Sequence, residues 1–182
     1  MTYYGGEELA RSFRTVRANT VQTAKDIAEQ SYGFAPATGV RSVSEILAHL
    51  AVFPQFQHGI HGPDRRASFE GFDFLAVMER MAEQEAVQRT KGQLIDLLEK
   101  EGEVWATFLE GLPESFLAES FAMPPGATPA AKSRFEMLLS VKEHEMHHRG
   151  QLMYLQRLLG LVPHLTRARE EQMAAMSSSQ TL

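Results

Sequence analysis

The chain has 182 residues, of which 43% are hydrophobic, and a formal net charge of −5 with both signs mixed along its length. This length fits one domain with a full core, and the charge argues against nucleic acid as the main partner, because phosphate binding needs a concentrated basic face. Cysteine is absent, which excludes disulfides, zinc ribbons and cysteine nucleophiles, so any metal must be held by His, Asp, Glu or water.

Two further features of the sequence bear on location. No apolar run approaches the ~20 residues that span a bilayer. The N-terminal sequence MTYYGGEELARSF has no basic region followed by an apolar stretch, so it does not resemble a signal peptide. We therefore expect a cytoplasmic protein with no membrane partner.

Hydrophobic residues recur at helical spacing over most of the chain. They predict a first helix from Glu7 to about Gln30 and a second helix that opens with a capping box of Ser42 and Glu45. Pro54 should kink or restart the second helix, because it lacks a backbone N–H group. The stretch HGIHGPDRR that follows is predicted to be a loop.

The middle of the chain holds a long connection and a third helix. The linker of residues 61–89 contains a short extra helix over about residues 74–89, and the sequence leaves the role of this linker open. Thr90 and Gln93 can cap a third long helix, which ends at the sequence GLP of residues 111–113.

A loop rich in Pro and Gly leads to a fourth helix, from about Pro129 or Ala131 to Leu159. No segment has the alternation of a strand. Four amphipathic helices, with a long crossover and a short extra helix between the second and the third, predict an all-α four-helix bundle. We expect a single domain over residues 1–165 and a frayed or disordered tail over residues 166–182.

Three of the seven histidines lie within five positions of the fourth helix, in the sequence HEMHH. At 100° per residue, His148 lies about 40° from His144 within the apolar stripe, whereas His147 lies about 60° to the other side, at its margin. Two imidazoles one turn apart can share a cation. His49 lies among apolar residues of the second helix and is the best candidate for a third ligand. The alternative is that each histidine is a hydrogen-bonded core residue.

Acidic residues near these histidines are weaker candidates. Glu101, in the apolar stripe of the third helix, could act as a general base or support a metal-bound histidine, or it could form a salt bridge at the helix edge. Glu45 is expected to cap its helix. A di-iron site would need Glu-x-x-His motifs on two helices. Glu145 and His148 have this spacing, but the second helix does not, so di-iron chemistry is disfavoured.

The strings ILAHLAVF, TKGQLIDLLE and HEMHHRGQLMYLQRLLGL resemble the DinB/YfiT-like family of damage-inducible bacterial proteins. The likeness covers about residues 7–163. It implies a four-helix bundle in which three histidines hold a divalent metal, and these match His49, His144 and His148 here. It also implies a homodimer, since family members are frequently dimeric. Some members of the wider superfamily use the metal to activate a low-molecular-weight thiol.

Three neutral imidazoles would leave the cation its full charge and open positions for water or substrate, as in catalytic zinc sites. Such a metal can lower the pKa of a bound water or thiol and polarise a carbonyl. We expect zinc or nickel, with iron or manganese as alternatives. The sequence therefore predicts a thiol-dependent transferase or a hydrolase that acts on a small molecule. One alternative is a non-catalytic, stress-related module that binds metal or a small molecule, and another is a homodimer in which the metal only ties two helices together.

Overall fold

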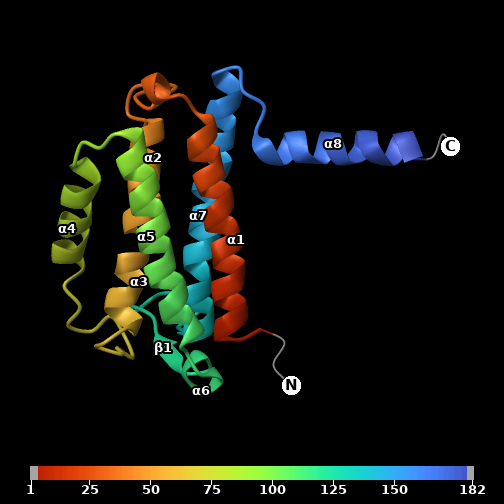
Figure 1. Cartoon of the computed structure of the whole chain (residues 1–182). Coiled ribbons are helices and arrows are strands. Elements are labelled where there is room, and N and C mark those ends of the chain that lie inside the picture. The colour runs from red at the N-terminus through yellow and green to blue at the C-terminus, as the bar shows by residue number, and fades with distance from the viewer. Residues whose placement is uncertain (1–3, 180–182) are drawn as a thin grey trace.

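A computed structural model of the chain describes residues 4–179 and shows a bundle of long helices (Figure 1). In chain order the elements are α1 (Gly6–Asp26), the 3-10 turn η1 (Glu29–Ser31), α2 (Val43–Val52), α3 (Pro54–His61), α4 (Phe74–Ala86), α5 (Lys91–Glu110), α6 (Glu114–Leu117), β1 (Ser120–Ala122), β2 (Ala131–Ser133), α7 (Arg134–Leu158) and α8 (His164–Ser179). Within these described residues, no helix has the length and apolar character needed to cross a membrane.

The bundle is formed by four helical segments, which are α1, α2 with its continuation α3, α5 and α7. Helices α5 and α7 each pack against both α1 and α2, so α1 and α2 occupy opposite corners. In Figure 1, α1 and α7 run upward, whereas α2, its continuation α3, and α5 run downward. Helix α4 lies against α2 on the outside of the bundle and carries the chain back to the start of α5. The predicted all-α four-helix bundle, with a short extra helix in the crossover, is confirmed.

The sequence signals at the helix ends correspond to observed caps. The side chain of Ser42 accepts from the backbone N–H of Glu45, whose carboxylate accepts from the backbone N–H of Ser42, and Thr90 and Gln93 form the same reciprocal pair at the start of α5. Pro54 occupies the first turn of α3, directly after α2 ends, as its missing N–H group predicts.

The stretch HGIHGPDRR is only partly a loop. Helix α3 continues through His61, so the prediction is wrong for residues 58–61. The reason is that Pro54 starts a new helix, and its inward face buries Gln57, Ile60 and His61. Burial of these three side chains stabilises a segment whose glycines would otherwise favour a turn.

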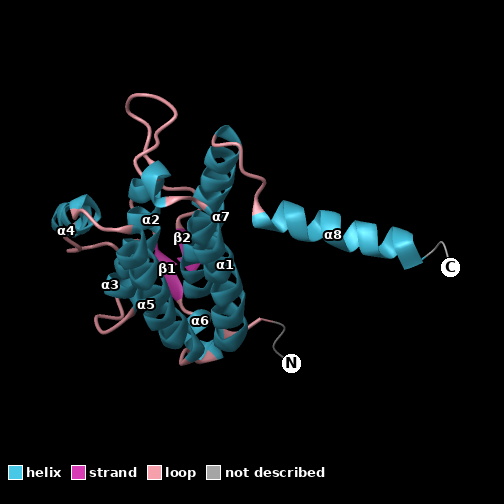
Figure 2. Cartoon of the chain, turned by 45° about the horizontal axis from the view of Figure 1, so that its top comes forward, coloured by secondary structure: helices cyan, strands magenta, loops and turns pink. Residues whose placement is uncertain are grey.

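The prediction that no strand is present is also wrong, although the strands are short. Strands β1 and β2 form an antiparallel pair in which Ser120 is opposite Ser133 (Figure 2). Strands of three residues leave no detectable alternation in the sequence. The pair joins the two ends of the Pro- and Gly-rich loop, and Ser133 then caps α7 through a capping box with Glu136.

Helix α8 covers most of the segment for which the sequence predicts a frayed tail. It projects away from the bundle (Figure 2), and its side chains from Arg169 to Ser178 are exposed. The first turn of α8 is held to α1 by the ion pair of Arg167 with Asp26, but beyond it the helix depends mainly on local propensity, which is marginal in water. Fraying of this segment therefore stays a prediction, and residues 180–182 lie outside the described part of the chain.

The two larger apolar clusters of the core are separated by a polar layer, and a third, smaller cluster contains Ile60, Phe121 and Met137. On α1, Phe13 belongs to one cluster and Val21 to the other, and Arg17 lies between them. On α7, Val141 and Leu152 belong to opposite clusters in the same way. The histidine motif therefore lies at mid-height in the bundle, at the level of the buried Arg17.

Candidate metal centre

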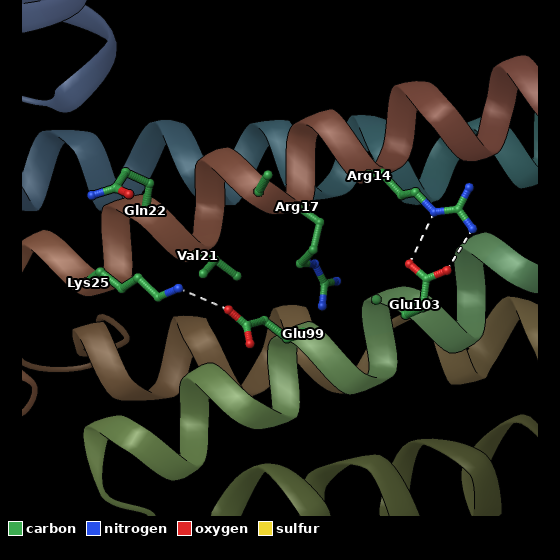
Figure 3. Close-up of a pocket in the computed structure, with 9 residues that line it drawn as sticks. Arg14, Arg17, Val21, Gln22, Lys25, Glu99 and Glu103 are labelled. Carbon is green, nitrogen blue, oxygen red and sulfur yellow. Dashed lines mark hydrogen bonds and ion pairs between the residues drawn. The ribbon is translucent and has the colours of Figure 1, made fainter.

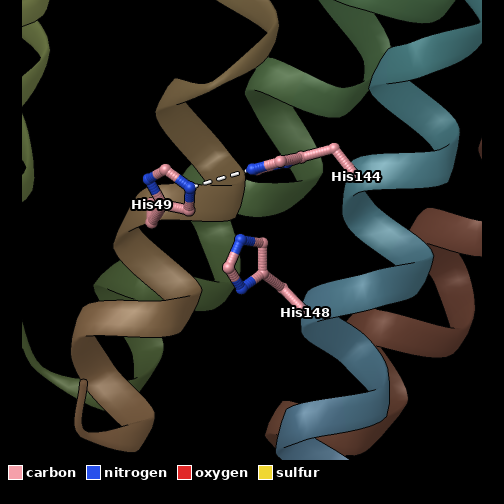
Figure 4. Close-up of side chains that lie close together, drawn as sticks. All are labelled: His49, His144 and His148. Atoms are coloured by element: carbon pink, nitrogen blue, oxygen red, sulfur yellow. Dashed lines mark hydrogen bonds between the residues drawn. The ribbon is translucent and has the colours of Figure 1, made fainter. Parts of the chain in front are cut away.

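The structure brings three histidines from distant parts of the chain together (Figure 4). His49 is on α2, and His144 and His148 are one turn apart on α7. One ring nitrogen of each lies within 4.8 Å of the others, and the Nε2 atoms of His49 and His144 are 3.0 Å apart. These are the three residues that the sequence singles out as metal ligands.

The cluster is largely shielded from solvent. The exposed fractions of His49 and His148 are 9% and 8%, and the ring of His144 stacks on Phe53 with the ring centroids 3.5 Å apart. Phe53 joins α2 to α3, so the break at Pro54 positions the aromatic ring that covers His144. Shielding strengthens electrostatic interactions at the cluster by lowering the local dielectric constant.

Two of the imidazoles are oriented by acceptors on their outer side. Nδ1 of His49 lies 2.7 Å from Oε1 of Glu85, and Nδ1 of His148 lies 2.7 Å from Oε1 of Gln151. A carboxylate only accepts, so Nδ1 of His49 carries a proton, and in the neutral ring Nε2 then presents a lone pair. The amide nitrogen of Gln151 faces Nε2 of His147 at 3.2 Å, which turns its oxygen toward His148 and gives His148 the same tautomer.

His144 differs from the other two histidines. Within the described chain, its buried Nδ1 has no hydrogen-bond partner. Burial, followed by the neighbouring His148 and His49, lowers the pKa of His144 to about 3. Burial also lowers the pKa of His148. Both imidazoles are therefore neutral at physiological pH, which is the form that binds metal.

The donor set fits a divalent cation of borderline softness. Tetrahedral coordination at about 2.0–2.1 Å places imidazole nitrogens about 3.3 Å apart, and the observed separations, 3.0 Å for the closest pair and at most 4.8 Å, span that value. Without a cation, three nitrogens converge where at most one proton can be shared between a pair. A metal ion satisfies all three at once.

A groove of about 680 Å³ opens beside the cluster. His148 and Gln151 form part of its wall, and His147 lies at the same edge. The other side chains that line it are mostly apolar, and Arg41 is the one charged group among them. This lining includes Pro36, Val40, Ile46, Tyr154 and Leu155. A small molecule in this groove would lie next to the histidines.

The other residues considered from sequence lie apart from the cluster. Oε2 of Glu101 accepts from Nε2 of Gln55 at 3.2 Å and lines a small cavity with His58 and Trp105. Its role as a base stays a prediction, and its contacts are with Gln55 and Lys100 rather than with the candidate metal ligands. Glu45 caps α2, as expected. His147 is exposed on α7, in agreement with its marginal position on the helical wheel.

Sequence reasoning missed the buried ion pair of Arg17 and Glu145. Their side chains meet at 2.9 Å with 5% and 1% exposure. Arg17 also donates to the backbone carbonyls of Leu50 on α2 and Leu98 on α5, at 2.9 and 2.7 Å. Glu145 faces α1 and is thereby excluded from a di-iron arrangement with His148. The signal in the sequence was an arginine among the core positions of the first helix.

Two local features make this pair feasible. Pro54 has no N–H group, so the carbonyl of Leu50 lacks its helical partner and is available to Arg17. Gly102 leaves the space that Arg17 fills, since a Cβ there would lie 2.9 Å from Cγ of Arg17. Arg17 is one of the residues that line a groove between α1 and α5 (Figure 3), where Arg14 pairs with Glu103 and Lys25 with Glu99. These two ion pairs neutralise the charges at the edge of the groove.

Comparison with known proteins places these observations in a family. The DinB superfamily matches residues 12–152 of the chain. Among curated proteins, no sequence matches it.

Solved structures share the fold at low sequence identity. YfiT from Bacillus subtilis, described as "a probable metal-dependent hydrolase with an unusual four-helix bundle topology", is 15% identical with a TM-score of 0.64, over 88% of this chain and 91% of its own. A DinB-like protein from Bacillus subtilis is 22% identical with a TM-score of 0.57, over 84% and 92%. The colibactin self-resistance protein ClbS, solved with dsDNA, is 14% identical with a TM-score of 0.61, over 86% and 98%. At these identities the likeness shows the fold alone.

Proposed function

The chain belongs to the DinB superfamily, and from this premise we propose that it holds one divalent metal ion at His49, His144 and His148 and uses it to act on a small molecule. The reaction we favour is metal-dependent hydrolysis or thiol transfer. The description of YfiT as a probable metal-dependent hydrolase supports the first of these, and the three-histidine group in this chain is compatible with both.

The observation that carries the proposal is the direction of the ring nitrogens. The Nδ1 atoms of His49 and His148 are held by oxygen acceptors, so their Nε2 lone pairs are directed inward, toward the ring of His144. Three converging nitrogens with no common proton donor form an incomplete hydrogen-bonding group. A group of this kind is typical of a metal site with its ligands preorganised.

When bound, the metal would supply Lewis acidity, undiminished because neutral imidazoles bring no negative charge. The residues of the chain have separate roles in this proposal. The three histidines bind the ion, Gln151 orients His148, and the stacked ring of Phe53 excludes water from His144. The groove beside His148 would hold the substrate, with its apolar lining against the substrate body.

A non-catalytic binding module remains the rival function, and one observation favours it. None of the residues that line the groove is an aspartate or glutamate, so no carboxylate is placed there to act as a general base. His147 is the one groove residue outside the ligand set with a titratable imidazole. An enzyme at this site would need a proton acceptor in addition to the metal, and His147 is the candidate in the groove. A binding module would need none.

Metal loading tests the first part of the proposal. Protein prepared without an affinity tag and reloaded with zinc should contain close to one metal ion per chain by elemental analysis. His49→Ala and His144→Ala should each abolish loading, because two imidazoles leave a weak site. His147→Ala is the matched control and should load normally. Absence of metal from the reloaded wild-type chain would overturn the proposal.

Activity distinguishes the enzyme from the binding module. The zinc-loaded protein should be assayed with a panel of esters and amides, and with electrophiles in the presence of small thiols. Turnover that disappears in His144→Ala and persists in Arg14→Met would support catalysis at this centre. Metal loading without turnover on any of these substrates would favour the binding module.

A further inference from the structure

The acceptor that orients His49 comes from the linker whose role the sequence leaves open. Glu85 lies in the last turn of α4, and its side chain is 20% exposed. Elsewhere α4 is weakly anchored, since Met81 is its one buried residue and Phe74 and Leu75 are 50% and 73% exposed. The contact between Glu85 and His49 therefore joins the C-terminal end of α4 to the bundle, while at the other end the ring of Phe74 packs edge-to-face on Phe56 of α3.

Both carboxylate oxygens of Glu85 face groups near the cluster. Oε1 lies 2.7 Å from Nδ1 of His49, and Oε2 lies 3.8 Å from the guanidinium of Arg41. In Figure 4 one nitrogen of the His49 ring is directed toward His144 and the other away from it, and the outward one is the nitrogen that meets Glu85. The carboxylate therefore determines which ring nitrogen of His49 carries the proton.

The position of Glu85 opposes a local preference. A carboxylate in the last turn of a helix is repelled by the negative end of the helix dipole. The last turn of α4 contains no basic residue, and the repulsion is offset only from outside the helix, by Arg89, which donates to the carbonyl of Gln84, and by Arg41 at 3.8 Å from the carboxylate. Residues that break a local rule are often placed by function, and the hydrogen bond to His49 supplies a reason for a glutamate here.

We infer that Glu85 is a positioning residue of the metal centre, which fixes the Nδ1–H tautomer of His49 and couples metal binding to the docking of α4. The inference rests on the proposed function for the identity of the ligand. A carboxylate behind a ligating imidazole orients the ring and raises its basicity. By thermodynamic linkage, a metal ion that favours this tautomer also favours the docked position of α4.

The test compares Glu85→Ala and Glu85→Gln with Glu83→Gln, an exposed glutamate of the same helix. Zinc affinity is measured by competition with a chromophoric chelator. We expect zinc to bind roughly 10- to 100-fold more weakly to Glu85→Ala. Glu85→Gln should lose less, because its amide oxygen can still accept from Nδ1–H, and Glu83→Gln should match the wild type.

Two readouts separate positioning from a general loss of structure. In the metal-free protein, ¹⁵N NMR of the His49 ring should report a single Nδ1–H tautomer in the wild type and a mixture in Glu85→Ala. Hydrogen exchange of α4 amides should slow on zinc addition in the wild type and change little in Glu85→Ala. The denaturant midpoint of Glu85→Gln verifies that the bundle remains folded.

The outcomes are distinguishable from those of the proposed function. If the wild type binds no zinc, the proposed function fails, and the tautomer of His49 in the metal-free protein still decides the role of Glu85. If zinc affinity and the His49 tautomer are the same in Glu85→Ala and the wild type, Glu85 has no positioning role. Equal loss of affinity in Glu83→Gln would also overturn the inference.

Discussion

Two polar clusters lie next to each other on α7 and differ in how their hydrogen bonds are completed. Glu145 and Arg17 form a closed network, in which the three guanidinium nitrogens meet a carboxylate and two backbone carbonyls. His144, one residue away, belongs to a cluster whose ring nitrogens face each other. The first cluster is satisfied by the chain itself, whereas the second would be completed by the cation that we propose.

This difference distinguishes polar groups that are buried with partners from the chain, and so stabilise the fold, from polar groups that are buried to bind a ligand. Buried charges are tolerated where each has a partner, and Arg17 has partners on α2, α5 and α7. The histidine cluster would be costly if it served only to stabilise the bundle, because its members offer one another too few protons. The metal ion that we propose would replace those protons and account for the burial of the cluster.

The largest expected effect is on the closed network. Arg17→Met leaves the Glu145 carboxylate buried without a partner and should lower the free energy of unfolding by about 3–5 kcal/mol, measured by urea denaturation. The matched control is Arg14→Met, one turn earlier on α1, which removes half-exposed ion pairs and should cost at most about 1 kcal/mol. Equal losses in the two variants would show that the Arg17 network contributes no more to the free energy of unfolding than a surface ion pair.

A third buried polar cluster, formed by His61 and Arg134, extends the comparison to the pH dependence of stability. His61 is 1% exposed, its Nδ1 accepts from Arg134, and burial together with the Arg134 charge lowers its pKa to about 4. The unfolded chain therefore binds a proton that the folded chain does not, between about pH 6.5 and 4. Stability should fall as the pH drops through this window, by up to about 3 kcal/mol from this residue.

The contribution of His61 is obtained as a difference between two chains. Urea denaturation of the wild type and of His61→Gln is measured from pH 7 to 4, and the slope should be flatter in the variant. Identical slopes would mean that His61 keeps its ordinary titration in the folded state.

Metal-linked stability tests the open cluster directly. Free zinc at 100 times its dissociation constant should raise the free energy of unfolding of the wild type by about 2.7 kcal/mol. The same zinc concentration should have no effect on His148→Ala, and Arg14→Met should respond as the wild type does. A zinc-induced shift that survives in His148→Ala would place the binding site elsewhere.

The smallest expected effect concerns two helical glycines with opposite surroundings. Gly102→Ala places a Cβ against Arg17 and should lower the free energy of unfolding by about 1 kcal/mol, the crowding exceeding the gain in helix propensity. At Gly150 a Cβ would meet nothing within 4 Å, so Gly150→Ala should raise stability by roughly 0.5–1 kcal/mol. Loss of stability in Gly150→Ala would reveal a neighbour packed against this surface, as expected for a homodimer.

Hydrophobic periodicity and capping residues were sufficient to predict the main helices and to single out the three histidines as inward-facing residues. His144 and His148 could be assigned to the interior because they share an apolar stripe, and His49 because its neighbours in α2 are apolar. Glu85 could not be found in this way. It resembles Glu79 and Glu83 on the same exposed helix, and only the docking of α4 against α2 distinguishes it.

The remaining misses also arise from tertiary packing. An arginine on a predicted core face is usually assigned to the helix edge, because burial of its charge requires partners that the sequence does not reveal. Arg17 donates to the carbonyl of Leu50 on α2, which has no helical partner because Pro54 lacks an N–H group. Its side chain also fits against Gly102 on α5, where any other residue would place a Cβ. The short strands β1 and β2 depend on pairing across a loop, which local pattern cannot detect.

The separation of the candidate ligands along the chain has a consequence for folding. His49 and His144 are 95 residues apart, and Glu85 is 36 residues from His49, so the three histidines meet only after α2 and α7 have docked, and Glu85 joins them only after α4 has docked. Contacts of such long range form late, because the entropy of closing the intervening chain must first be overcome. Uptake of zinc during refolding should therefore report the completed native topology, and the kinetics of uptake should follow the slowest docking step.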